Sequence, residues 1–203
     1  MLNEASSTVK LPRLILASGS PRRAEILNSV GWEFEKLVPD VDESLVDGES
    51  PEDYVRRLAA LKAAAVDAAD LGECCVLAAD TTVVIDEHIL GKPVDLDDAR
   101  RMLRMLAGRR HEVLTGVAVR FRGDLEVGLQ RTGVRFAPMN EAEIEFLARE
   151  GDPLDKAGAY AVQAQAALFI EGIEGDYWNV VGLPINLVYQ LVKKAEAKTA
   201  SAR

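Results

Sequence analysis

A serine- and arginine-containing segment near the N-terminus has the residue types that hold phosphate. Residues 18–23 read Ser-Gly-Ser-Pro-Arg-Arg and lie between a short apolar run and a segment of helical periodicity. A helix N-terminus offers unpaired N–H groups and partial positive charge, and arginine presents a planar set of donors that suits phosphate oxygens. The candidate phosphate ligands are Ser18, Ser20, Arg22 and Arg23. Alternatively, Ser20 only caps the helix and both arginines are solvated.

Asp80 interrupts the most apolar stretch of the chain. Residues 76–85 are nearly continuously apolar and β-branched, a pattern typical of a strand covered on both faces. An unpartnered carboxylate there costs several kcal/mol, so the fold must supply a metal ion, a cation or hydrogen bonds. We interpret Asp80 as a metal ligand or general base. Alternatively, Thr81 or Thr82 and backbone amides satisfy it.

Two lysines are candidates for binding a polyanion in a cleft. Lys62 follows Val55 by seven residues and Leu58 by four, so it shares a helical face with apolar side chains. A lysine in such a place more often extends toward solvent. Lys92 lies on a loop after the expected central strand, where cations for a bound polyphosphate can collect.

Two polar segments are open to more than one interpretation. Glu43 lies in an acidic loop, residues 39–49, which is either a solvated surface or presents one carboxylate to a divalent ion. Residues 155–160, together with Gln163, form a small-residue segment whose polar groups either read a base edge or make a tight turn.

Strands and helices alternate early in the chain, and an antiparallel pair follows around Gly123-Asp124. Strands are expected at residues 14–17, 32–38, 76–85, 113–122, 126–136 and 167–173. Helices are expected from about residue 21 and at residues 51–70, 96–107, 140–151 and 186–196. This order predicts a mixed α/β fold in one domain, residues 1–203, with flexible tails at 1–10 and 197–203.

The composition narrows the class of protein. The 203 residues are 48% hydrophobic and carry a net charge of −9, which opposes broad affinity for nucleic acid. No apolar run reaches the ~20 residues of a membrane span, and the first ten residues lack a signal-peptide core. Cys74 and Cys75 are adjacent, which predicts reduced thiols in a strand and no zinc site. We expect a cytoplasmic protein that binds neither membrane nor nucleic acid.

Five motifs together resemble the Maf family in order and spacing. They are Ser18-Gly19-Ser20-Pro21-Arg22-Arg23, Ala79-Asp80-Thr81, Lys92-Pro93, Asp155-Lys156-Ala157-Gly158-Ala159-Tyr160 and Asn179-Val180-Val181-Gly182-Leu183-Pro184. The resemblance runs over residues 14–191, and so many ordered motifs over nearly the whole chain are very rarely a coincidence.

The resemblance implies a fold like that of inosine triphosphate pyrophosphatases: a mixed central sheet in two lobes, with helices on both sides and a cleft between the lobes. It also implies a homodimer and a nucleoside triphosphate pyrophosphatase that needs a divalent cation, Mg²⁺ or Mn²⁺. In the family, the aspartate that matches Asp80 is the proton acceptor. The other family positions matched in the cleft are Ser18, Ser20, Arg22, Arg23, Glu43, Lys62 and Lys92.

The resemblance also concerns the substrate. Residues matching Arg23, Thr81 and Gln163 are associated with the subgroup that hydrolyses dTTP and UTP rather than 7-methyl-GTP. The sequence departs from the family at Ala161 and at Ala164-Gln165, where glycines are usual, and these departures concern base selectivity.

Our hypothesis is hydrolysis of a nucleoside triphosphate, dTTP or UTP, to monophosphate and pyrophosphate by water attack at the α-phosphorus. Asp80 and Glu43 would hold the metal ion, and Asp80 would accept the proton. The alternatives are a nucleotide-binding regulator of septum formation, a phosphatase or nucleotidyltransferase, and a pyrophosphatase for modified or 7-methyl-GTP nucleotides.

Overall fold

A computed structural model describes residues 11–66 and 74–201 of the chain, and their strands form one seven-stranded sheet. The strand order is β2-β1-β3-β5-β6-β7, with β4 paired to β3. The strands are β1 (Leu14–Ala17), β2 (Phe34–Leu37), β3 (Cys75–Ile85), β4 (His88–Leu90), β5 (Arg110–Phe121), β6 (Asp124–Phe136) and β7 (Ile170–Glu174). The pairs that β1 forms are parallel and the others are antiparallel. The mixed sheet confirms the predicted α/β class.

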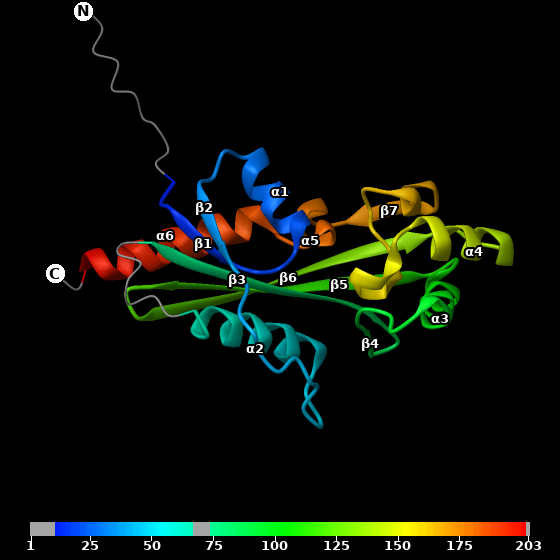
Figure 1. Ribbon diagram of the computed structural model, residues 1–203, viewed down its shortest axis with the longest axis horizontal. Helices are drawn as coiled ribbons and strands as arrows, with labels where there is room; N and C mark the ends of the chain where they lie inside the picture. Colours follow the sequence, from blue (N-terminus) through cyan, green and yellow to red (C-terminus); the bar gives the residue numbers. More distant parts are fainter. Residues whose placement is uncertain (1–10, 67–73, 202–203) are drawn as a thin grey trace, which may run out of the picture.

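The helices cover both faces of the sheet and divide the molecule into two lobes. They are α1 (Pro21–Ser29), α2 (Pro51–Ala64), α3 (Leu96–Leu106), α4 (Glu141–Glu150), α5 (Tyr177–Val181) and α6 (Ile185–Ser201). Figure 1 shows α1, α5 and α6 on one face of the sheet and α2 on the other, whereas α3 and α4 gather at the far end. The long strands β3, β5 and β6 run through both lobes and join them. The predicted two-lobed arrangement is confirmed.

β3 is the central strand that the apolar run predicts. Leu77 and Ala79 belong to the core under α1 and α6, whereas Val76 and Ala78 belong to the core under α2. Because side chains alternate along a strand, Asp80 continues the row that faces α2. Further along, β3 enters the core of the far lobe, so Asp80 lies where the lobes meet.

Two predicted helix starts are confirmed in detail. The Ser50 side chain caps α2 by accepting a hydrogen bond from the Asp53 N–H, and Pro51 occupies the first turn. Asn140 and Glu143 form the capping box that opens α4. These local signals are readable from sequence because both partners lie within three residues of each other.

Several elements differ from the expectation. The last strand begins at Ile170 because residues 165–168 form a 3₁₀ segment, and the short helix α5 was not predicted. The hairpin turn is Arg122-Gly123 rather than Gly123-Asp124, since those two residues have the positive φ angles that a two-residue turn requires. Helix α2 ends at Ala64, and residues 67–70 of the expected helix lie outside the described residues.

The chain's C-terminal region is helical where a flexible tail was expected. Helix α6 continues to Ser201, the last residue described. Lys194 and Lys198 both form ion pairs with Glu126 of β6, whose side chain is buried. This double ion pair fastens the last turns of α6 to the sheet. Within residues 11–66 and 74–201, no helix has the length and apolar character needed to cross a membrane.

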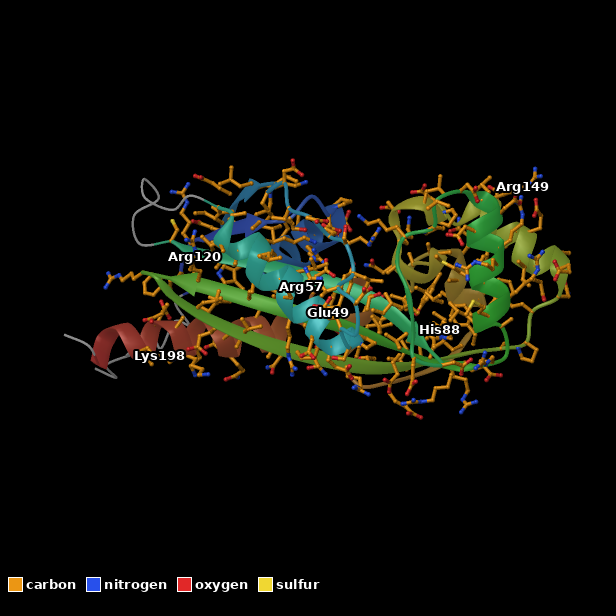
Figure 2. The ribbon with its side chains drawn as sticks, turned by 90° about the horizontal axis from the view of Figure 1, so that it is seen from below. Glu49, Arg57, His88, Arg120, Arg149 and Lys198 are labelled. Carbon is orange, nitrogen blue, oxygen red and sulfur yellow. The ribbon has the colours of Figure 1, made fainter. Side chains whose placement is uncertain are left out.

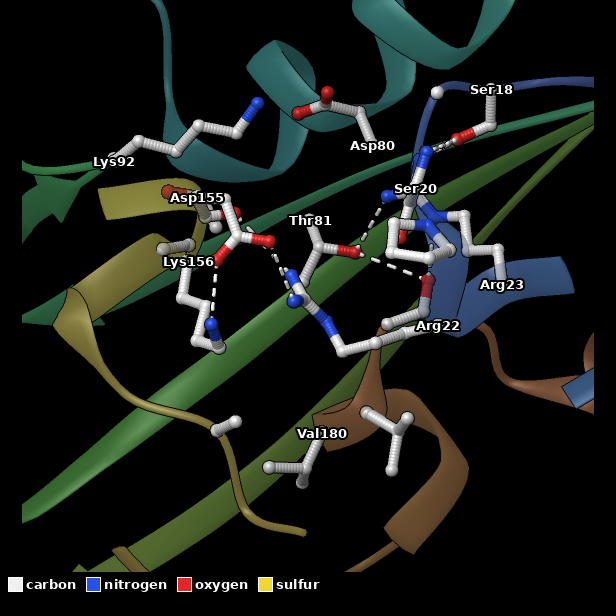
Figure 3. A pocket seen from close by; sticks show the side chains of 18 of the residues that line it. Ser18, Ser20, Arg22, Arg23, Asp80, Thr81, Lys92, Asp155, Lys156 and Val180 are labelled. Carbon is white, nitrogen blue, oxygen red and sulfur yellow. Dashed lines mark hydrogen bonds and ion pairs between the residues drawn. The ribbon is translucent and has the colours of Figure 1, made fainter. Parts of the chain in front are cut away.

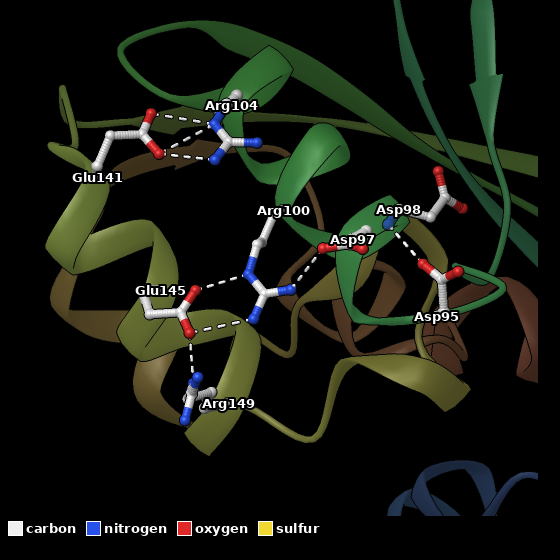
Figure 4. Close-up of polar contacts among 8 residues, drawn as sticks. All are labelled: Asp95, Asp97, Asp98, Arg100, Arg104, Glu141, Glu145 and Arg149. Carbon is white, nitrogen blue, oxygen red and sulfur yellow. Dashed lines mark hydrogen bonds and ion pairs between the residues drawn. The ribbon is translucent and has the colours of Figure 1, made fainter.

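An ion-pair network joins α3 to α4 in the far lobe (Figure 4). Arg100 donates to both oxygens of Glu145, at 2.6 and 3.0 Å, and Arg149 donates to the same carboxylate. One turn away, Arg104 makes a similar two-oxygen contact with Glu141. The hydrogen bonds from Arg100 and Arg149 lower the pKa of Glu145 from 4.5 to about 2.

We expect Gly116→Ala to destabilise the protein, because this glycine lets α2 approach the sheet. A Cβ there would lie 2.2 Å from the carbonyl oxygen of Val55 and 2.8 Å from the backbone nitrogen of Arg56. Overpacking of this kind costs about 1–3 kcal/mol, measured here as a lower midpoint of urea unfolding. Gly172→Ala is the control, since its added Cβ would meet no atom within 4 Å. Equal midpoints for both variants would contradict the interpretation.

The Glu145 network predicts a pH dependence of stability. Because the folded pKa is depressed, Glu145 stabilises the fold above pH 4.5, and this contribution disappears as the pH falls toward 2. We expect Glu145→Gln to flatten the pH dependence of the free energy of unfolding in this window. Arg100→Met, which removes the main partner, should flatten it as well. A variant that loses stability as steeply as the wild type over this window would disprove the prediction.

Candidate active site

A pocket of about 640 Å³ lies where the two lobes meet, within the size range of small-molecule sites. Its wall comes from the N-terminus of α1, the middle of β3, the inner face of α2 and the segments 155–163 and 180–182 (Figure 3). All ten side chains proposed from sequence line it: Ser18, Ser20, Arg22, Arg23, Glu43, Lys62, Asp80, Thr81, Lys92 and Gln163. The fold therefore brings together residues that are up to 145 positions apart in the chain.

Lys62 is the cation that the buried carboxylate of Asp80 requires. Its Nζ lies 2.6 Å from Oδ1 of Asp80 and 2.7 Å from Oε1 of Glu43. The side chains of Lys62 and Asp80 are each 11% exposed, so this pair is largely removed from water. The expectation that such a lysine extends toward solvent is wrong here, because its ammonium finds two carboxylates inside the pocket.

The alternative in which neighbouring threonines satisfy Asp80 is also wrong. Thr82 donates to the carbonyl oxygen of Leu90, and the Thr81 hydroxyl lies 2.9 Å from that of Thr115. Since side chains alternate along β3, Thr81 points to the face opposite Asp80. The partner of the carboxylate comes from a different element of the fold.

The charges around Lys62 set the ionisation of Glu43 and Tyr54. Burial acts to raise the pKa of Glu43, but the hydrogen bond and charge of Lys62, with the charge of Lys92, lower it below its usual value. Burial and the nearby charges of Asp80 and Glu43 raise the pKa of Tyr54 to about 12. At neutral pH, Glu43 is therefore ionised, and Tyr54 keeps the proton that it donates to the Glu43 carbonyl oxygen at 3.1 Å.

The pocket is locally positive in a protein of net charge −9. Figure 3 shows Lys92 and Asp80 pointing toward one another across it. The cationic side chains in its wall are Arg22, Arg23, Lys62, Lys92 and Lys156, and the anionic ones are Glu43, Asp80 and Asp155. A cleft with this surplus of positive charge attracts polyanions even when the whole surface is acidic.

The N-terminus of α1 lacks the side-chain compensation found at other helix starts. Ser20 occupies the N-cap position, yet its side chain makes no capping hydrogen bond and the first turn holds no acid. By contrast, α2, α3 and α4 all have side-chain caps and acidic first turns. The interpretation of Ser20 as a simple cap is wrong. The positive end of the α1 dipole faces the pocket without an internal anion.

Arg23 has most of its donors engaged by the protein itself. Its guanidinium donates to the carbonyl oxygens of Ala79 (2.7 Å) and Gly182 (2.9 Å). It also donates to the hydroxyls of Ser18 (2.9 Å) and Thr81 (3.1 Å). Because arginine has five N–H groups, at most one remains for a ligand. Arg23 is thus neither solvated nor a free phosphate fork, and it joins α1, β3 and the segment 180–182.

Arg22 reaches across the pocket to the far lobe. It donates to Oδ2 of Asp155 at 3.0 Å and to the carbonyl oxygen of the same residue at 3.3 Å. Lys156 contacts the other carboxylate oxygen at 2.6 Å. Burial acts to raise the pKa of Asp155, whereas the hydrogen bond of Lys156 and the charge of Arg22 lower it overall. Arg22 remains partly exposed in the pocket, so phosphate oxygens can reach its guanidinium.

The residues associated with base selectivity differ in what they offer a ligand. Thr81 accepts a hydrogen bond from Arg23 and contacts Thr115, so its hydroxyl is part of the protein's own network. Gln163 is exposed at the pocket edge, and its amide makes no hydrogen bond to another described residue. Of the three, Gln163 has the polar group that is available to read a base.

The sequence interpretation missed Tyr54, which lines the pocket and contacts the Glu43 backbone. A signal was present, because Tyr54, Leu58 and Lys62 recur every four residues and so share one face of α2. The ion pair between Arg22 and Asp155 had no comparable signal, since its partners are 133 residues apart.

The chain is similar to known proteins over most of its length. The family model for Maf-like protein matches residues 13–195. The chain is 50% identical to a Symbiobacterium thermophilum protein named dTTP/UTP pyrophosphatase, covering 90% of this chain and 93% of that one. It is 50% identical to a Chromobacterium violaceum protein of the same name, covering 86% and 90%.

Among solved structures, a nucleoside-triphosphatase / dITP/XTP pyrophosphatase from Mycobacterium abscessus is 20% identical with a TM-score of 0.43, covering 63% of this chain and 75% of that one. The Ham1 protein of Staphylococcus aureus is 16% identical, also with a TM-score of 0.43, covering 62% and 72%. The family match and the relatives at 50% identity, each over most of the chain, show that this protein belongs to the Maf-like protein family.

Proposed function

We propose that this protein hydrolyses nucleoside triphosphates, dTTP and UTP in the first place, to the monophosphate and pyrophosphate. The observation that carries the proposal is the Glu43–Lys62–Asp80 cluster at the floor of a locally positive pocket. Relatives at 50% identity that are named dTTP/UTP pyrophosphatase support the substrate class. We also predict a homodimer, which the resemblance implies, and a cytoplasmic location, which the composition suggests.

The triphosphate has suitable partners along one side of the pocket. The uncapped N-terminus of α1 and the hydroxyl of Ser20 offer donors, and Arg22 and Lys92 offer positive charge. Donors that are already fixed by the fold stabilise charge that develops on phosphate oxygens without further reorganisation. Arg23 acts differently: its hydrogen bonds hold Ser18 and the wall at Gly182 in place.

The carboxylates of Glu43 and Asp80 fit a divalent metal ion. Both approach the same ammonium within 2.7 Å, so their oxygens converge on one small region. Mg²⁺ commonly binds one or two carboxylates together with substrate phosphate oxygens, which suits a site with two acids beside a phosphate pocket. We propose that these two residues hold Mg²⁺ or Mn²⁺. When bound, the ion would offset the negative charge of the phosphate groups.

The proton from the attacking water needs an acceptor, and Asp80 is the proposed base. Its Oδ1 accepts the hydrogen bond of Lys62, whereas Oδ2 makes no hydrogen bond to another described residue. In the reaction, the water oxygen bonds to the α-phosphorus. The bond between the α-phosphorus and the oxygen that bridges it to the β-phosphate breaks. Pyrophosphate leaves with that oxygen, and Asp80 takes the water proton. Lys62 orients the carboxylate and opposes its charge.

The base subsite follows from the opposite wall of the pocket. Val162, Val180 and Val181 supply apolar surface, and the Gln163 amide supplies a donor and an acceptor. An amide of this kind can pair with the edge of uracil or thymine, whereas apolar walls accept the ring faces. This arrangement supports the proposed pyrimidine preference.

We expect Asp80→Asn to lower kcat for dTTP and UTP about 10²-fold or more, since an amide cannot accept the proton. Pyrophosphate release in the presence of magnesium measures the effect. Asp86→Asn is the matched control, because Asp86 is an exposed acid of the far lobe that pairs with Arg109. Near wild-type turnover by folded Asp80→Asn would refute the role of Asp80.

The same assay tests the metal ion. Removal of divalent cations with EDTA should abolish pyrophosphate release, and added Mg²⁺ or Mn²⁺ should restore it. Turnover that persists in EDTA would overturn the metal part of the proposal and leave hydrolysis itself standing.

We expect Gln163→Ala to narrow the preference for pyrimidine over purine triphosphates about tenfold, the effect of losing one well-formed hydrogen bond. The measurement is kcat/KM for dTTP, UTP, dATP and dGTP. Gln165→Ala is the control, because that glutamine lies two residues away and does not line the pocket. An unchanged ratio of kcat/KM for pyrimidine over purine triphosphates in Gln163→Ala would exclude Gln163 from base selection.

A further inference from the structure

The segment that carries Glu43 into the pocket has little apolar anchoring of its own. Residues 39–49 contain no helix or strand, and nearly all of their side chains are exposed. Among its apolar side chains, Leu45 and Val46 are 57% and 56% exposed, and only Pro39 and Val41 are half-buried. Burial of apolar surface therefore contributes little to its position, and polar contacts must supply most of the restraint.

Arg57 of α2 provides the strongest of these contacts. Its Nε and Nη2 donate to the two carboxylate oxygens of Glu49, at 2.6 and 2.7 Å. Nη2 also donates to the carbonyl oxygen of Ser44 at 3.0 Å. Figure 2 shows Arg57 and Glu49 side by side on the outer side of α2. Arg57 thus contacts the segment at two points, at Glu49 near its end and at Ser44 beside Glu43.

This ion pair differs from an ordinary surface pair. The side chain of Glu49 is only 9% exposed and that of Arg57 28%, and the contact is bidentate. The hydrogen bonds from Arg57 lower the pKa of Glu49, so the carboxylate is ionised at neutral pH. Exposed single-contact pairs contribute little, whereas bidentate pairs with low exposure restrain geometry.

Further hydrogen bonds lie within residues 39–49 and extend to Glu43. The Glu49 carboxylate accepts from the Val46 N–H at 3.4 Å, and the Glu49 N–H donates to the Val46 carbonyl oxygen at 3.0 Å. Tyr54, whose ring lies 5.7 Å from the Arg57 guanidinium carbon, donates to the carbonyl oxygen of Glu43. The backbone that follows the Glu43 side chain is therefore fastened to α2 at the carbonyl groups of Glu43 and Ser44.

We propose that Arg57 is a positioning residue, which holds Glu43 against Lys62 through its contacts with Glu49 and the Ser44 carbonyl oxygen. Arg57 does not line the pocket, so its effect on the reaction is indirect. Lys62 belongs to the same helix. Helix α2 therefore positions both Glu43 and Lys62 and sets their relative placement. The expected effect of Arg57 on kcat rests on the proposed function, whereas its effect on the position of the segment does not.

The test compares Arg57→Ala with Arg56→Ala. Arg56 is the adjacent arginine of α2, and the carboxylate with which it pairs, that of Asp53, is 3.9 Å away and exposed. Hydrogen exchange followed by mass spectrometry measures the stability of residues 40–49, and steady-state assays with dTTP and magnesium give kcat and KM. In Arg57→Ala we expect faster exchange in residues 40–49 alone, and a kcat about tenfold lower with a smaller change in KM. Arg56→Ala should change neither measurement.

Two further variants separate positioning from general stability. Glu49→Gln should show both effects to a smaller extent, because Arg57 keeps its contact with the Ser44 carbonyl oxygen. The double variant should be no worse than Arg57→Ala alone, because Arg57→Ala already removes both contacts. Arg57→Lys keeps the charge but not the bidentate geometry, so it should restore only part of kcat.

Unchanged exchange in residues 40–49, or unchanged kcat despite faster exchange there, would overturn the proposal. Faster exchange throughout α2 and β3 would overturn it as well, since that would indicate a structural role. Absence of turnover in the wild type would refute the proposed function alone, because the exchange measurement still decides whether Arg57 holds the segment.

Discussion

The ion pair between Lys62 and Asp80 is the interaction on which the site depends. A carboxylate in the central strand of a sheet is tolerated only when a cation lies close by, and here that cation comes from α2. Helix α2 must therefore pack tightly on the sheet. Gly116, which pairs with Asp80 across β3 and β5, leaves space for the α2 backbone to do so. The acidic segment before α2 then brings Glu43 to the same ammonium. The buried charge of Asp80 thus requires that α2 lies close to the sheet and that residue 116 has no side chain. It also accounts for the place of the acidic segment.

The cations of the pocket divide into two groups by what else they contact. Arg23 is buried and donates to four protein acceptors, so it organises the wall around Ser18, Thr81 and Gly182. Arg22 and Lys92 keep exposed charge that a ligand can reach. The two adjacent arginines of the N-terminal motif look equivalent in the sequence. Their roles differ because successive residues of a helix point in different directions, one toward β3 and one across the cleft.

The two lobes contribute different groups to one pocket. The lobe with α1 and α2 contributes the carboxylates, Lys62 and the uncapped helix start, whereas segment 155–163 of the other lobe contributes Gln163 and the partner of Arg22. Strands β3, β5 and β6 run through both lobes and hold these groups in register. The pocket exists because one sheet is long enough to carry two separate cores, with the site between them.

Much of the fold and of the list of site residues could be predicted from sequence. The apolar run of β3, the caps of α2 and α4, and the strand-to-helix turn at residues 18–23 depend on contacts within a few residues, so local pattern determines them. The motifs also sufficed to select the ten side chains that meet in the pocket. Only the tertiary structure determined which side chains contact each other. It showed that Lys62 points into the pocket, that Arg23 donates to carbonyl groups, and that Arg57 contacts the segment that carries Glu43. These pairings join different elements of the fold, and direction and distance between such elements arise from packing, which the order of residues does not display.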